Sequence, residues 1–160
     1  MEAKLKKDWF GRQKSVEELH NDSRNWITEI DFIHDEMRFL EHLLSSSYID
    51  FLEQGYQDKI NKIVTKITEE KGAGKTLKNL LFKHGKVLSD LIKSESVLSN
   101  KNYLETHKKF EREINIFLRK YKALKKEVFD IVENIIQIKN QKKIAPKSYN
   151  IIEKNEKVNQ

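Results

Sequence analysis

The histidines and the carboxylates near them are the residues of this chain whose types and spacing could do chemistry. Glu17 and His20 form a Glu-x-x-His pair, and His107 lies one helical turn before Glu111. On a helix, either spacing puts a carboxylate and an imidazole on one face, which is the arrangement that di-iron bundles use. A complete di-metal site needs two Glu-x-x-His motifs and a Glu from each of two further helices, and the sequence lacks that set.

The candidate metal ligands are therefore few, and we expect no metal to be bound. They are Glu17, His20, His84, His107 and Glu111. Counted from the turn between the second and third predicted helices, His84 and His107 differ in height by about eight residues, or roughly 12 Å. That distance is too long for one metal ion to bridge. The sequence instead predicts that both histidines are hydrogen-bonded polar positions of the core, and it predicts no catalytic residue and no cofactor.

The height of His20 depends on where the first helix ends. If that helix ends near Ser46, His20 comes level with His84, and if it continues to Gly55, the two histidines separate by roughly a dozen ångströms. The sequence leaves both alternatives open.

A second group of candidates is a basic cluster within two helical turns, formed by Arg119, Lys120, Lys122, Lys125 and Lys126. Basic side chains at this density could contact phosphates and release counterions. The charges of the predicted helices compensate one another, however, because residues 15–53 hold ten acidic and two basic side chains while both later helices are basic. We therefore expect a solvated helix face and no nucleic-acid partner.

Three long runs of apolar residues at helical spacing predict the elements that carry these side chains. The third helix has the most regular seam, Tyr103, His107, Phe110, Ile114, Phe117, Tyr121, Leu124, Val128, Ile131, Ile135 and Ile138. The first helix should begin at a capping serine, Ser15, with the seam Val16, Leu19, Ser23, Trp26, Ile30, Ile33, Met37, Leu40 and Leu44. The second begins near Gln57, with apolar positions Ile60, Ile63, Val64, Ile67, Leu77, Leu80, Leu81, His84, Val87, Leu88, Leu91 and Ile92.

These elements predict an all-α protein, an antiparallel bundle of three long helices. The apolar seam of the second helix keeps its phase across Gly72 and Gly74, which favours one continuous helix with a weak or bent centre. The alternative is a four-helix bundle in which the second helix breaks at Gly72–Gly74.

The domain organisation follows from the same pattern. Residues 1–14 are a basic N-terminal arm, residues 15–145 form a single helical-bundle domain, and residues 146–160 are predicted to be a disordered tail. The chain has no cysteine and no stretch of 18 apolar residues, so we expect a cytoplasmic protein without a membrane span.

The first helix carries a resemblance to a known group of proteins. Trp26 is followed by Glu29-Ile30-Asp31-Phe32 and then by Asp35-Glu36-Met37. With this pattern the chain resembles uncharacterised helical-bundle proteins of Bacteroidota. The resemblance implies no particular activity. Trp26 and Phe32 are then packing residues.

The functional expectation is a non-enzymatic bundle that binds another protein or itself. Apolar side chains beside the seams make the stripes wider than three helices need, and they suggest a pairing face at Phe32, Phe39, Phe129 and Ile136. A metal-binding bundle is the alternative, and a weak nucleic-acid binder that uses the basic cluster comes third.

Overall fold

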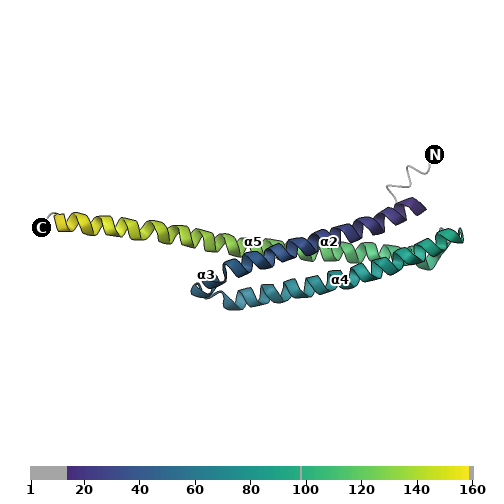
Figure 1. Cartoon of the computed structure of the whole chain (residues 1–160), viewed down its shortest axis with the longest axis horizontal. Coiled ribbons are helices and arrows are strands. Elements are labelled where there is room, and N and C mark those ends of the chain that lie inside the picture. The colour runs from purple at the N-terminus through teal and green to yellow at the C-terminus, as the bar shows by residue number, and fades with distance from the viewer. Residues whose placement is uncertain (1–13, 98, 159–160) are drawn as a thin grey trace. The chain divides into compact units, whose positions relative to one another are not determined.

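The protein is all-α, as predicted. The computed structural model describes residues 14–97 and 99–158, with side chains as far as Lys143. Its elements are α2 (Val16–Ser46), α3 (Tyr48–Glu53), α4 (Gln57–Lys93) and α5 (Lys101–Val158), as Figure 1 shows. No strand occurs among the described residues. Three long helices and one short helix thus confirm the helical bundle.

The chain forms two compact units, and each of the three long helices contributes to both. The first unit comprises Met1–Glu36 and Glu69–Tyr121, and it includes the connection from α4 to α5. The second comprises Met37–Thr68 and Lys122–Gln160, and it includes α3. The predicted arm lies outside the described residues except for Lys14.

The start of α2 follows the predicted capping pattern. The backbone N–H of Glu18 donates to the hydroxyl oxygen of Ser15 at 3.2 Å. The serine therefore satisfies one of the amides that have no partner within the first turn of a helix.

The first predicted helix was expected to end either near Ser46 or at Gly55, and the structure combines both alternatives. α2 ends at Ser46, but α3 follows after a single residue and buries Phe51 completely. Gly55 then ends α3 with φ of 73°, where the N–H of Tyr56 donates to the carbonyl of Phe51 at 2.9 Å. Glycine adopts this left-handed backbone without steric cost, so it can close the helix here.

α4 is continuous through its glycines, so the four-helix alternative with a broken second helix is wrong. Gly74 is buried on the α4 seam, and a Cβ placed there would lie 3.0 Å from Cζ of Phe117 and 3.6 Å from Cγ2 of Ile30. The glycine therefore gives room to an aromatic ring of α5 within the first unit. Gly72 has no such neighbour within 4 Å.

The predicted seams form the cores of the two units. Every seam residue of α5 from Tyr103 to Ile135 is buried, and Ile138 is half-buried. On α2 the seam is buried from Leu19 to Leu44. The prediction for α4 is only partly right, because Val64, Leu80, Val87 and Ile92 are more than 40% exposed.

The C-terminal end of α5 continues beyond the predicted bundle. The helix runs through Pro146 to Val158. In Figure 1 this C-terminal part of α5 extends beyond α3. The side chains after Lys143 lie outside the described residues, so the boundary of the bundle at residue 145 stays a prediction.

Candidate functional site: a buried histidine pair

His84 of α4 and His107 of α5 meet in the core of the first unit. Their side chains are nearly inaccessible, with 5% and 2% of the residue surface exposed. Nε2 of His84 lies 2.9 Å from Nδ1 of His107, which is a hydrogen-bond distance. The prediction of hydrogen-bonded core histidines is thus confirmed.

The predicted offset of about eight residues between these histidines is wrong. The count from the sequence assumed a later end of the second helix, whereas α4 already ends at Lys93 and α5 begins at Lys101. Glu95 has φ of 55° in this connection, and the N–H of Ser96 donates back to the carbonyl of Leu91 at 3.1 Å. This early helix end brings the two imidazoles to one level.

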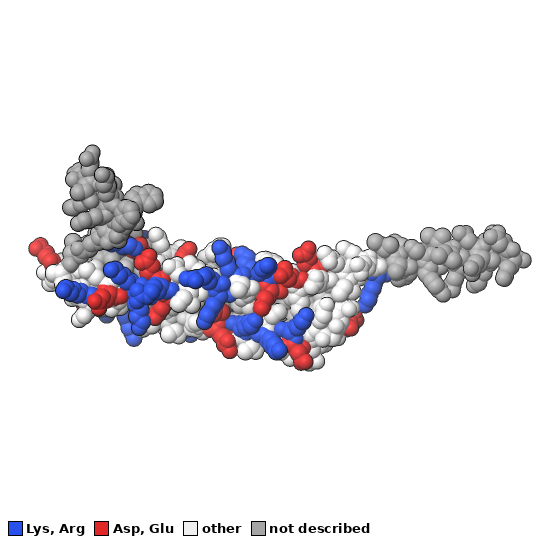
Figure 2. Space-filling model, turned by 180° about the vertical axis from the view of Figure 1, so that it is seen from behind, with Lys and Arg blue, Asp and Glu red and all other residues white. Residues whose placement is uncertain are grey.

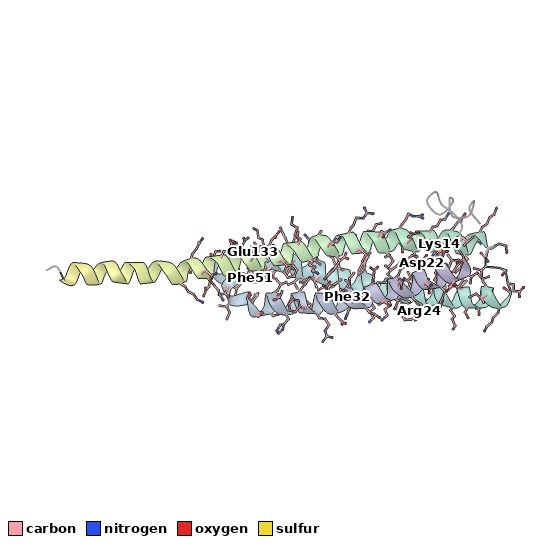
Figure 3. The ribbon with its side chains drawn as sticks, turned by 90° about the horizontal axis from the view of Figure 1, so that it is seen from above. Lys14, Asp22, Arg24, Phe32, Phe51 and Glu133 are labelled. Atoms are coloured by element: carbon pink, nitrogen blue, oxygen red, sulfur yellow. The ribbon has the colours of Figure 1, made fainter. Side chains whose placement is uncertain are left out.

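Asp22 of α2 completes the cluster, and sequence reasoning missed it. Oδ2 of Asp22 lies 2.9 Å from Nε2 of His107 and 2.6 Å from the ammonium of Lys14. Lys14 is also 3.9 Å from the carboxylate of Glu111. In Figure 3 the labelled Lys14 and Asp22 lie close together at one end of the ribbon. Its position beside the seam residue Ser23 could have indicated that Asp22 lies near the core. Its partner His107 could not be read from the sequence.

Aromatic rings enclose the two imidazoles. Tyr103 stacks on His84 with an angle of 3° between the planes and 4.3 Å between the centroids. Phe110 lies 4.9 Å from the His84 ring, and Trp26 lies 4.8 Å from the His107 ring. Because these rings are buried, the imidazoles depend on each other and on Asp22 for hydrogen bonds. Trp26 is a packing residue, as predicted, whereas the same assignment for Phe32 is wrong because its side chain is 63% exposed.

The environment makes both histidines harder to protonate. Burial, together with the nearby His107, lowers the pKa of His84 from 6.5 to about 4. Burial also lowers the pKa of His107, although the hydrogen bond to Asp22 acts in the opposite direction. For Asp22, burial alone would raise the pKa, but the hydrogen bonds from His107 and Lys14 outweigh it and lower the pKa. At neutral pH the cluster therefore contains one carboxylate and two neutral imidazoles.

The carboxylate determines where the imidazole protons lie. An ionised carboxylate only accepts, so Nε2–H of His107 donates to Asp22. Nδ1 of His107 then carries the lone pair and accepts from Nε2–H of His84. Nδ1 of His84 is left unprotonated. The three side chains form a directed chain of hydrogen bonds across α4, α5 and α2.

The structure brings together only some of the candidate metal ligands. His84 and His107 touch, whereas Glu17 and His20 are exposed on α2. Glu111 is half-buried near Lys14. Among the described residues, no group of three or more His, Asp or Glu side chains is arranged to hold a metal ion.

A second polar contact lies elsewhere in the first unit. The hydroxyl of Tyr121 on α5 donates to the carboxylate of Glu36 on α2. Burial, strengthened by this hydrogen bond, raises the pKa of Tyr121. Burial also raises the pKa of Glu70 on α4, with Glu69 adding to the effect and Lys120 opposing it.

Four of the five side chains of the predicted basic cluster are exposed, namely Arg119, Lys120, Lys122 and Lys126. Lys125 is half-buried, and its ammonium lies 6.0 Å from the centroid of the Phe129 ring. The charge of Lys120 also acts on Glu70, whose pKa it lowers against the effect of burial. On the face that Figure 2 shows, basic and acidic side chains are interspersed.

The four residues of the predicted pairing face are all exposed. Phe32 and Phe39 of α2 are 63% and 56% exposed, and Phe129 and Ile136 of α5 are 43% and 52% exposed. Figure 3 labels Phe32 on its helix. Each pair is seven residues apart and therefore lies on one face of its helix. Leu80 and Val87 form a third pair with this spacing on α4, which the sequence analysis had assigned to the core.

Within the part of the chain that the structure describes, no helix is apolar over enough of its length to cross a membrane. No protein-family model matches the chain, and comparison with curated proteins and with solved structures finds no match. The resemblance of the first helix to helical-bundle proteins of Bacteroidota stays a prediction.

Proposed function

We propose that this chain is a non-enzymatic, cytoplasmic helical bundle that binds another protein or a second copy of itself. The observation that carries the proposal is the exposed apolar pair Phe32 and Phe39 on α2. Both side chains lie outside cores that the seams already fill. Burying a side chain of this size stabilises an interface by about 1.5–3 kcal/mol.

The spacing of the exposed pairs indicates the kind of partner. Residues seven apart on a helix lie about 10.5 Å from each other along its axis and face the same way. A partner helix that packs along α2 or α5 would contact both members of a pair, as in a coiled coil. The partner is therefore an amphipathic helix, from this protein or from another.

The size of the particle in solution tests this proposal. Light scattering on the purified full chain should give a mass well above that of the monomer, and high salt should not dissociate it because apolar contacts are not screened. Replacing Phe32 and Phe39 together by Ser should reduce the mass to that of the monomer without unfolding the protein. The same replacement of Phe129 and Ile136, the exposed pair on α5, tests whether α5 also forms part of the interface.

Two outcomes would separate self-association from binding to a different protein. A monomeric chain that recovers one helical partner from its own cells, and loses it in the Phe32 and Phe39 variant, identifies a different protein as the partner. A strict monomer at high concentration that recovers no partner would contradict the proposal.

A metal-binding bundle is the alternative function. His84 and His107 could bind a metal ion through their hydrogen-bonded nitrogens only if the hydrogen bond between the two rings or the bond from His107 to Asp22 were broken. Elemental analysis of the native protein should then find near-stoichiometric metal, and a chelator should lower the melting temperature. Weak nucleic-acid binding through the cluster of Arg119, Lys120, Lys122, Lys125 and Lys126 comes third, and its affinity would fall steeply with salt.

A further inference from the structure

The hydrogen-bonded chain from His84 through His107 to Asp22 ties together the three helices of the first unit. Each of its two bonds crosses from one helix to another, from α4 to α5 and from α5 to α2. Two of the three side chains in this hydrogen-bonded chain are histidines, the residue type whose ordinary pKa lies nearest to physiological pH. Its integrity therefore depends on how many protons the two imidazoles carry.

The hydrogen bonds can accommodate one added proton. It can enter at Nδ1 of His84, and Nε2–H of that ring still donates to His107. If the proton in this bond moves across to Nδ1 of His107, the positive charge comes next to the carboxylate of Asp22, and Nε2 of His84 becomes the acceptor. Both bonds survive in either arrangement, because one lone pair remains between the rings.

A second added proton leaves no such lone pair. Nε2 of His84 and Nδ1 of His107 would both carry hydrogen while facing each other, so the bond between them is lost. Two positive rings would then lie with centroids 5.2 Å apart in an aromatic enclosure. Among the described residues, Asp22 is the only carboxylate hydrogen-bonded to the pair, and Lys14 already holds that carboxylate at 2.6 Å.

We propose that the His84–His107–Asp22 cluster is a pH-sensitive latch: it holds the α2 portion of the first unit against α4 and α5 and opens when both imidazoles are protonated. The surrounding charges act in different directions. Asp22 and Glu111 favour protonation of His107, whereas Lys14 opposes it. The Tyr103 phenol beside His84 stays neutral throughout, because burial raises its pKa to about 12.

The sign of the pH effect follows from the lowered histidine pKa values. Once the latch opens, its histidines regain ordinary pKa values, so the open form binds protons at a higher pH than the closed form does. Acidification below about pH 6.5 therefore favours opening. For His84, a shift from 6.5 to about 4 makes opening roughly 30-fold more frequent at pH 5 than at pH 7.5.

Hydrogen exchange of the full chain between pH 7.5 and pH 5, corrected for the intrinsic pH dependence of exchange, tests the latch. Residues of the first unit around Asp22 should open at least tenfold more often at pH 5, while the second unit should show a much smaller change. His84→Gln should abolish most of this increase, because a glutamine amide can donate to His107 but does not titrate. The matched controls replace the exposed His20, His34 or His42 by Gln, and they should preserve the increase.

Imidazole NMR provides a second measurement on the unmodified protein, which remains decisive if the glutamine variant does not fold. Both buried histidines should titrate below the ordinary histidine pKa of 6.5, with His84 near pH 4. Titration of both buried imidazoles near pH 6.5, or an equal pH dependence of opening in the wild type and a folded His84→Gln variant, would overturn the proposal.

Discussion

Substituting the two central glycines of α4 by alanine should change stability in opposite directions. Both positions are helical, so alanine should gain about 1 kcal/mol over glycine at each from the smaller backbone entropy of the unfolded chain. At Gly72 nothing lies within 4 Å of the added methyl group. Gly72→Ala should therefore stabilise the protein by about 1 kcal/mol.

At Gly74 the same gain is opposed by packing. The added methyl would lie 3.0 Å from Cζ and 3.2 Å from Cε2 of Phe117. Phe117 is only 5% exposed, so its ring cannot move out into solvent. Overpacking a core typically costs about 1–3 kcal/mol, which exceeds the helical gain. Gly74→Ala should thus destabilise the protein by about 1 kcal/mol.

Chemical denaturation with a shared slope measures both effects as shifts of the midpoint. Gly85→Ala is a matched control on the same helix, with open space around the added methyl, and it should raise the midpoint as Gly72→Ala does. In a Phe117→Leu background the penalty of Gly74→Ala should shrink, because the ring that meets the methyl is absent. A lower midpoint for Gly72→Ala would refute the continuous α4, and equal gains at both central glycines would refute the close contact.

Three further predictions use the same assay. Glu95→Gly should raise the unfolding free energy by about 1 kcal/mol, because Glu95 has φ of 55° and a side chain disfavours that backbone; a clear loss would argue against a left-handed residue there. Phe51→Ala should cost about 3–5 kcal/mol because Phe51 is completely buried, whereas Leu52→Ala, at a 41% exposed neighbour, should cost much less. Tyr121→Phe should cost about 1–3 kcal/mol by removing the donor to Glu36, and an unchanged midpoint would show that this hydrogen bond does not contribute.

Helical spacing was sufficient to predict the core residues of α5 and most of those of α2. The α5 seam from Tyr103 to Ile135 is buried without exception, because residues three and four apart on a helix must share a face. The same rule failed for Leu80 and Val87 of α4, which are half-exposed. Both residues lie at the edge of the apolar stripe, and the packing of the neighbouring helix decides whether such edges are covered.

The candidate site shows where the sequence was not sufficient. Both histidines could be assigned to the core, but their hydrogen bond could not be predicted, because it depends on the early end of α4 at Lys93. A glycine often marks such a helix end, whereas here Glu95 adopts the left-handed backbone in its place. A short error in the length of a helix changes the level of every residue on it relative to the next helix.

The sequence by itself determined the helical class, the three apolar seams and the capping serine of α2, because each depends on residues close together along the chain. The tertiary structure alone decided that Gly74 faces Phe117 and that Asp22 meets His107. Both contacts join residues distant in sequence, whose meeting depends on the register between helices, and that register is set by the connections and by side-chain packing.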